Sequence, residues 1–158
     1  MQKKFLMNLL LAFVWVALTG KFLVSNFLFG FALAFLLLWT ITRDAGSRRY
    51  FTRIPRVISF MGYFGYELLK ANLQVAYDII TPKFYMTPGI VRIPLSAETD
   101  LEITLLANLI SLTPGSLSID VSDDRKVLYV HAMYIGDKDE YVAHVKNGFE
   151  KRLLDILR

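Results

Sequence analysis

Two histidines and three serines are the first candidates for chemistry in this sequence. His131 falls in an expected strand and His144 in an expected helix, and neither belongs to an HxH or HExxH pattern. Ser111, Ser116 and Ser118 lack the strand–turn–helix context of a nucleophile elbow. Cysteine is absent, which excludes thiol nucleophiles, disulfides and thiolate metal sites. The residue types therefore predict no catalytic site, no bound metal and no cofactor.

The remaining polar candidates have simpler structural interpretations. Asp123-Asp124 is better explained as turn chemistry than as a metal site. Asn108 lies in an apolar stretch and is expected to make a structural hydrogen bond, because unpaired burial of its amide costs about 1–3 kcal/mol. His131 is expected to be a satisfied core residue or an interface residue, with a proton relay as the weaker alternative.

Residues 89–158 carry the pattern of a small α+β domain of order β-α-β-β-α. Thr99-x-x-Glu102 and Asp137-x-x-Glu140 are capping boxes that open two helices, and Pro114-Gly115 ends the first of them. The expected strands are 90–95, 116–121 and 126–133, and the expected helices are 100–112 and 137–157.

Apolar periodicity predicts which helix faces form the core of this domain. The first helix has two apolar stripes, so it should be buried on two faces or rest against the membrane unit: Leu101, Leu105, Leu109 and Leu112, then Ile103, Leu106 and Ile110. The last helix has one apolar face, with Lys146, Glu150, Lys151 and Arg152 largely elsewhere: Tyr141, Val142, Val145, Phe149, Leu153 and Ile156.

The first third of the chain is a candidate membrane hairpin. Residues 5–19 and 22–42 are uncharged, and the second run has 21 residues, enough to cross ~30 Å of hydrocarbon. A signal peptide is the alternative for the first run, but a second apolar run follows almost at once. Gly20-Lys21 suits the tip of a hairpin, and Asn8 and Asn26 suit hydrogen bonds between its helices.

Charge is unevenly distributed along the 158 residues. Segments 1–42 and 43–56 have net charges of +3 and +4, whereas 57–80 and 81–158 have −1 and −2. Basic residues therefore flank the apolar runs, which predicts that the N-terminus and the C-terminal domain face the cytoplasm. A nucleic-acid partner is not expected, because the excess of positive charge lies beside the apolar runs rather than among aromatics on a folded surface.

Residues 57–80 are ambiguous between a third span and an amphipathic helix on the membrane surface or against partner helices. At 100° per residue they separate into two faces. A crossing would bury Glu67 and Lys70 as a compensated pair. The polar face holds Ser59, Tyr63, Glu67, Lys70, Gln74 and Asp78, and the apolar face holds Val57, Ile58, Met61, Phe64, Leu68, Ala71, Val75 and Ile79.

The most distinctive stretch runs from Leu105 to Val121, LLANLISLTPGSLSIDV. It resembles the A-N-x-I-T-L-T-P-G-T-L-T-x-D signature of the MnhE/MrpE family of Mrp-type multisubunit Na+/H+ antiporters, with serine at 111, 116 and 118 where threonine is usual. Matching positions that stand out as structural or interaction candidates are Asn108, Thr113, Pro114, Gly115 and Asp120. The motif describes a helix end, a Pro-Gly turn and a strand start.

The resemblance covers essentially the whole chain, which we divide into a transmembrane hairpin with a basic connector (1–56), an amphipathic helix and linker (57–88), and a cytoplasmic α+β domain (89–158). It implies a multi-pass cell-membrane protein that is an accessory subunit in a hetero-oligomer, in which the whole complex handles Na+ and H+. No ionisable residue lies inside either apolar run, so the chain is expected to support assembly and stability rather than to carry ions. The alternative is a stand-alone membrane-anchored module that binds a soluble partner through its α+β domain, and a membrane enzyme is the weakest hypothesis.

Overall fold

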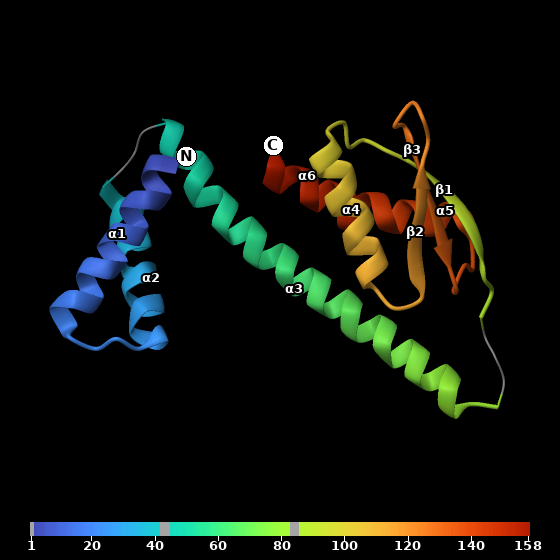
Figure 1. The fold of residues 1–158 in the computed structure, drawn as a ribbon, viewed down its shortest axis with the longest axis horizontal. Coiled ribbons are helices and arrows are strands. Elements are labelled where there is room, and N and C mark those ends of the chain that lie inside the picture. The colour runs from blue at the N-terminus through green and yellow to red at the C-terminus, as the bar shows by residue number, and fades with distance from the viewer. Residues whose placement is uncertain (1, 42–44, 83–85) are drawn as a thin grey trace. The chain divides into compact units, whose positions relative to one another are not determined.

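The computed structural model describes residues 2–41, 45–82 and 86–158, and the side chains among them except 2–3 and 45–51. The chain divides into two compact units, Met1–Pro55 and Arg56–Arg158. The elements in Figure 1 are α1 (Gln2–Thr19), α2 (Val24–Ile41), α3 (Ala45–Ile80), β1 (Gly89–Pro94), α4 (Asp100–Leu112), β2 (Ser116–Val121), β3 (Val127–Ala132), α5 (Lys138–His144), the π-helix η1 (Val145–Glu150) and α6 (Lys151–Leu157).

The N-terminal unit contains the predicted helical hairpin. Gly20 turns the chain with φ +64°, and the Trp15 indole donates to Asn26 Oδ1 at 3.0 Å while the Asn26 amide donates to Thr19 Oγ1 at 2.7 Å. A Cβ on Gly30 would lie 2.6 Å from Trp15 Cδ1, so glycine permits this close packing. Within the described part of the chain, α2 is the one helix long and apolar enough to cross a membrane, and α1 is a shorter apolar helix.

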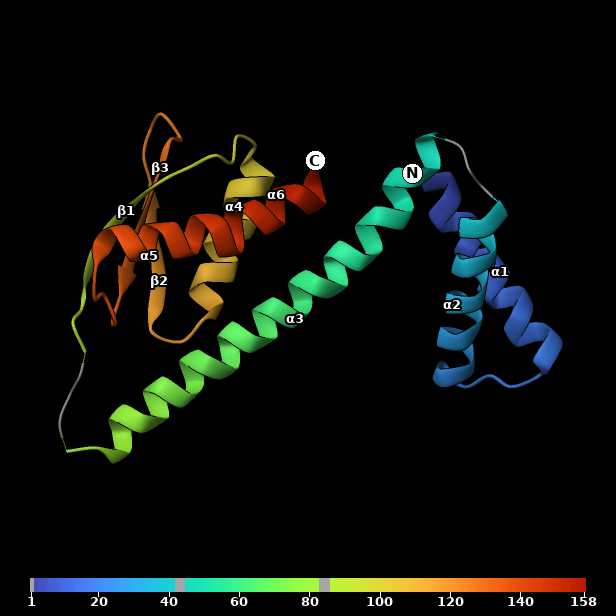
Figure 2. The ribbon, with the colours of Figure 1, turned by 180° about the vertical axis from the view of Figure 1, so that it is seen from behind.

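The C-terminal unit has the predicted β-α-β-β-α order. Its three strands form an antiparallel sheet of order β1-β3-β2, so that β1 is an edge strand as its terminal Pro94 indicated. Thr99 and Glu102 form the expected capping box, with Glu102 N–H donating to Thr99 Oγ1 at 3.2 Å. Asp137 caps α5 by accepting from the N–H groups of Asp139 and Glu140. Figures 1 and 2 show α4 and the α5–η1–α6 rod on one side of the sheet.

One core joins this side of the sheet to the helices. Alternate residues of β1 and β3 point into it, and helices α4, η1 and α6 cover them. Its buried members are Val91, Ile93, Leu106, Ile110, Leu128, Val130, Ala132, Ile135, Val145, Phe149 and Leu153.

The prediction that α4 is buried on two faces was wrong in part. The stripe containing Ile103, Leu106 and Ile110 is buried in the core. The other stripe begins and ends with Leu101 and Leu112, which are 61% and 62% exposed. Between them, Leu105 and Leu109 are half-buried and pack against the core, so the second stripe is covered in its middle and exposed at its two ends.

The final helix also differs from the expectation, because it widens into a π-helix over Val145–Glu150. This wider turn brings three consecutive residues, Gly148, Phe149 and Glu150, to the inside. Glu150 was expected on the solvated side, yet its side chain is only 2% exposed. Its carboxylate accepts from the backbone N–H groups of Ser96 and Ala97 and from Lys146 Nζ, which offsets the cost of burying the charge.

The helix expected at 57–80 begins earlier, at Ala45, and continues through Pro55. From Arg56 onward it belongs to the C-terminal unit. Tyr63 and Phe64 contact the Phe149 ring edge-on at centroid distances of 5.5 and 6.4 Å. The side of α3 that faces the chain's own domain is therefore the boundary between its polar and apolar faces, which the sequence pattern did not indicate.

The surface that α3 leaves exposed contains no charged residue near its centre. Phe64, Leu68, Ala71 and Val75 were expected on the apolar outer face but are half-buried. The other four residues of the expected apolar face, Val57, Ile58, Met61 and Ile79, are exposed. The exposed apolar surface extends beyond them around the helix to Tyr66, Leu69, Leu73, Tyr77 and Ile80.

Candidate functional site

The distinctive motif builds the turn between α4 and β2. Thr113 Oγ1 and Ser116 Oγ both donate to the Ile110 carbonyl, at 2.5 and 2.6 Å, and the two hydroxyls lie 2.7 Å apart. These bonds satisfy a carbonyl that the end of the helix leaves without a helical partner. Gly115 has φ +86°, a left-handed conformation that favours glycine, and the Tyr134 ring packs against it.

Two further serines of the motif tie β2 to the body of α4. Ser118 Oγ donates to the Ala107 carbonyl at 3.0 Å, and Ser111 Oγ accepts from the Ser118 N–H at 3.0 Å. All three motif serines therefore serve internal hydrogen bonds, which agrees with the expectation that the motif is a folding feature. A hydroxyl is the requirement at these positions, which serine and threonine both meet.

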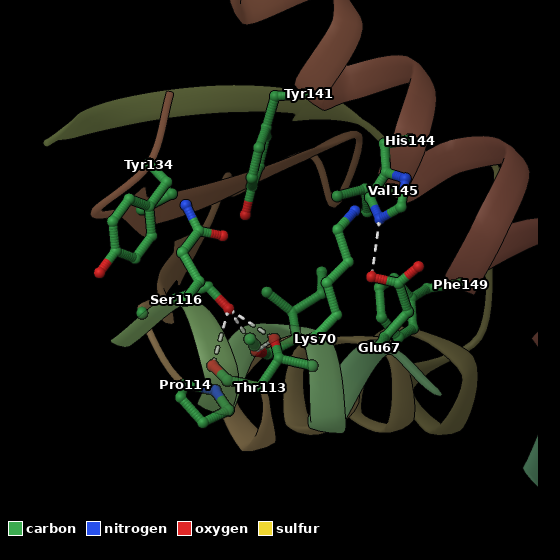
Figure 3. A pocket seen from close by; sticks show the side chains of 15 residues that line it. Glu67, Lys70, Thr113, Pro114, Ser116, Tyr134, Tyr141, His144, Val145 and Phe149 are labelled. Atoms are coloured by element: carbon green, nitrogen blue, oxygen red, sulfur yellow. Dashed lines mark hydrogen bonds and ion pairs between the residues drawn. The ribbon is translucent and has the colours of Figure 1, made fainter. Parts of the chain in front are cut away.

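A pocket of about 220 Å³ lies where this turn meets the inner face of α3. Figure 3 shows Glu67 and Lys70 of α3, the motif turn, Tyr134, and Tyr141 and His144 of α5 gathered around it. Its other lining residues are Ala71, Gln74, Ile110, Ala132, Val145 and Phe149.

The pocket contains one ion pair between the helix and the domain. Glu67 Oε2 lies 3.4 Å from His144 Nε2, and the two side chains are 12% and 43% exposed. Lys70 lies one turn further along α3 and lines the same pocket. The pair therefore holds α3 to α5 at a site that water can reach.

Two tyrosines surround the motif turn and have altered acidity. Burial raises the pKa of the Tyr141 hydroxyl, and its hydrogen bond with Ser116 opposes part of that shift. A hydrogen bond to Asp78 raises the pKa of Tyr134, and burial adds to the effect. Both phenols stay protonated at neutral pH, and Tyr134 acts as a hydrogen-bond donor to Asp78. Tyr134 thereby gives the buried Asp78 carboxylate of α3 a partner from the domain.

Five of the eight residues singled out from the sequence line this pocket: Glu67, Lys70, Thr113, Pro114 and Gly115. The other three lie elsewhere. Asn108 is exposed on α4, so burial does not force a hydrogen bond on its amide. Asp120 is exposed at a β2 bulge and accepts from the Val121 N–H, and His131 is half-exposed on the sheet face opposite the core.

Sequence reasoning missed four polar lining residues: Gln74, Tyr134, Tyr141 and His144. Gln74 was assigned to the polar face of its helix, but nothing in the pattern indicated what would cover that face. His144 follows the predicted core position Tyr141 by three residues, so helical spacing places them near each other. That spacing was the available signal for a polar residue at the edge of the core.

The chemistry open to this arrangement is limited to hydrogen bonding and ion pairing. In the portions of the chain that the structure describes, no group of three or more His, Cys, Asp or Glu residues could hold a metal ion. The motif hydroxyls are occupied by backbone carbonyls, so they are not poised as nucleophiles. The site is best suited to fixing the domain on α3.

Comparison with known proteins identifies relatives over the whole chain. A family model described as "Na+/H+ ion antiporter subunit" matches residues 8–156. The Na(+)/H(+) antiporter E subunits of Alkalihalophilus pseudofirmus and Bacillus subtilis are each 35% identical over 158 residues, covering 100% of both chains. The corresponding E1 subunit of Staphylococcus haemolyticus is 35% identical over 156 residues, 99% of this chain and 98% of the relative.

Two solved membrane complexes contain similar chains. One chain of the Mrp complex from Dietzia sp. DQ12-45-1b is 31% identical, with a TM-score of 0.50 over 65% of this chain and 96% of its own length. One chain of the membrane-bound sulfane sulfur reductase, an archaeal respiratory membrane complex, is 28% identical, with a TM-score of 0.57 over 95% of this chain and 96% of its own.

Proposed function

Because the chain belongs to the MnhE/MrpE family of Na+/H+ antiporter subunits, we propose that it is the bracing subunit of a multisubunit cation/proton antiporter, needed for assembly rather than for carrying ions. Its relatives are subunits of Na+/H+ antiporters and of larger membrane complexes, so its partners are other antiporter subunits and its location is the membrane. In this proposal the complex as a whole exchanges Na+ and H+, and the chain is not an enzyme.

The observation that carries the proposal is the structural role of the distinctive motif. Its hydroxyls cap α4 and join α4 to β2, and its turn lies against the polar face of α3. The residues that stand out most in the sequence therefore hold one helix to one domain. A subunit that carried ions would instead direct such polar groups toward a pathway through the membrane.

The composition and contacts of the hairpin also favour a role in assembly over a role in carrying ions. Residues 5–19 and 22–42 contain no Asp, Glu, His, Lys or Arg, and Asn26 is engaged by Trp15 and Thr19. We expect both apolar helices to cross the bilayer, with the N-terminus and the domain on the cytoplasmic side. A reporter fused after Arg158 tests this topology, and a signal from outside the cell would refute it.

The decisive experiment separates assembly from transport. Deletion of the chain should lower the amount of assembled complex and, in proportion, the antiport activity of membrane vesicles. Gly115→Ala should do the same in part, because alanine is strained at φ +86° and its Cβ would lie 3.2 Å from the Tyr134 ring. Activity per assembled complex should remain unchanged.

Gly136→Ala is the matched control, because a Cβ there meets nothing within 4 Å. It should leave both assembly and transport as in the wild type. Undiminished assembly and transport after deletion would reject a bracing role. A Gly115→Ala complex that assembles fully yet transports poorly would also reject it. Co-extraction of other antiporter subunits in mild detergent separates this role from that of a stand-alone interaction module.

A further inference from the structure

A second pocket, separate from the motif, opens at the start of the C-terminal unit. Its volume is about 440 Å³, and it lies between the beginning of α3, the end of β1, and the η1–α6 helix. Four cationic and two acidic side chains line it: Arg56, Lys146, Lys151 and Arg158 with Glu150 and Asp155.

Two of these cations are already neutralised. Lys146 Nζ lies 3.0 Å from the buried Glu150 carboxylate, and Arg158 Nε lies 3.1 Å from Glu102 Oε1. Glu150 also accepts from backbone N–H groups, so its negative charge is compensated by groups of the protein itself. Both pairs form the wall of the pocket and leave little charge for a ligand.

The other two cations remain available. Arg56 Nη1 donates to the backbone carbonyl of Asp155 at 3.0 Å, which fixes the guanidinium without cancelling its charge. Neither Arg56 nor Lys151 forms an ion pair with a carboxylate in the described residues. The Asp155 side chain is the only acid left in the lining to oppose them. A guanidinium that keeps spare N–H donors, with an exposed ammonium in the same lining, is suited to phosphate.

The position of Arg56 in the chain indicates which kind of molecule carries that phosphate. Only 14 residues of the chain separate Arg56 from Ile41, the last residue of apolar helix α2. Val57, Ile58 and Met61 follow immediately and are exposed apolar side chains. Basic residues beside exposed apolar ones are typical of contact with an anionic membrane surface.

We infer that the pocket between Arg56 and Lys151 binds the phosphate of an anionic phospholipid headgroup. Ser96 and Asn147 add a hydroxyl and an amide to the same lining, and Leu154 adds an apolar wall. A polyanion does not suit the site, because residues 57–158, with the pocket residues included, have a net charge of −3. The bound lipid would anchor the C-terminal unit to the membrane, in addition to any bracing role.

The test uses the whole antiporter complex, purified in neutral detergent and stripped of lipid. Binding of dihexanoyl phosphatidylglycerol, a short-chain soluble lipid, is measured for the wild type and for R56Q/K151Q. Each cation removed near a lipid phosphate costs about fivefold in affinity, so the double variant should bind about 25-fold more weakly. R56K retains the charge but loses the fork of N–H donors, so its affinity should lie between those of the wild type and R56Q/K151Q.

K126Q/K138Q is the control, because it removes two exposed cations elsewhere on the domain and should bind as the wild type does. Equal binding by R56Q/K151Q and the wild type would overturn the inference. Equal binding of the phosphatidylcholine analogue, or full competition by equimolar inorganic phosphate, would also overturn the lipid assignment. If the double variant fails to assemble, K151Q alone tests the inference through its fivefold loss, because Lys151 is exposed.

Discussion

The contact between Gly148 and Tyr63 allows the packing of α3 on the domain to be tested by a single methyl group. A Cβ on Gly148 would overlap the Tyr63 hydroxyl and lie 3.0 Å from Tyr63 Cζ. Tyr63 has little room to move, because its ring packs edge-on against Phe149 and lies under the Arg152 guanidinium at 4.5 Å. Overpacking of this kind costs about 1–3 kcal/mol.

Replacing glycine by alanine inside a helix also stabilises the folded state by about 0.5–1 kcal/mol, which offsets part of that cost. Gly148→Ala should therefore lower the free energy of unfolding by about 1–2 kcal/mol. For a unit of this size the expected fall in Tm is roughly 4–15 °C, followed by circular dichroism of the full chain in neutral detergent. Hydrogen exchange should also speed up along α3 between residues 58 and 78, because the helix loses its contact with the domain.

A second substitution shows whether the hydroxyl of Tyr63 is the cause. Tyr63→Phe removes the overlapping atom and should restore most of the stability lost in Gly148→Ala, with a coupling of about 1 kcal/mol between the two changes. Gly65→Ala is the control, since Gly65 lies on the exposed side of α3 with nothing within 4 Å. Unchanged stability of Gly148→Ala, or no rescue by Tyr63→Phe, would refute the proposed packing.

Three further substitutions test other contacts. Glu102→Gln should destabilise the chain by on the order of 2 kcal/mol at pH 7. The pKa of Glu102 is lowered to about 2 by its hydrogen bond with Arg158 and by backbone N–H groups. The stability that the Glu102 carboxylate contributes is therefore present above pH 4.5 and disappears as the pH falls toward 2. Urea unfolding of the wild type and the variant at pH 7 and at pH 2 checks this. Gly30→Ala should force Trp15 away from α2 and shift its fluorescence, whereas a spectrum identical to wild type would contradict the close packing. Leu106→Ala opens a cavity at a fully buried site and should cost about 2–5 kcal/mol in the same unfolding assay.

Local signals predicted most of the C-terminal domain because its elements are bounded by specific chemistry. The capping box of Thr99 and Glu102, the Pro-Gly turn at 114–115, and alternation along β3 each fix one boundary or one face. The motif turn could be placed for the same reason. Its hydroxyl partners, Ile110 and Ala107, are only a few residues away in the chain.

What the sequence could not indicate were contacts made between distant segments. Glu150 is charged and follows a solvated pattern, yet it is buried because the Ser96–Ala97 loop, more than fifty residues earlier, offers two N–H donors. The π-helix that turns Glu150 inward has no composition signal, and its Gly148 lies against Tyr63 of α3, which is more than eighty residues earlier in the chain. The pocket was missed likewise, because it needs α3 and the domain together.

The orientation of α3 bears directly on the choice between a complex subunit and a free-standing module. In a water-soluble domain an amphipathic helix turns its apolar face inward, because burying apolar surface stabilises the fold by about 25 cal/mol per Å². Here Glu67 and Asp78 face inward with partners from the domain, while Ile58, Leu69 and Leu73 are about 60% exposed. Over residues 58–80 this outer face is about 33 Å long at 1.5 Å per residue. Such a surface is stable only against lipid or another apolar protein surface. A neighbouring subunit of a membrane complex offers such a protein surface, whereas a stand-alone membrane-anchored module would have to place this face on the bilayer.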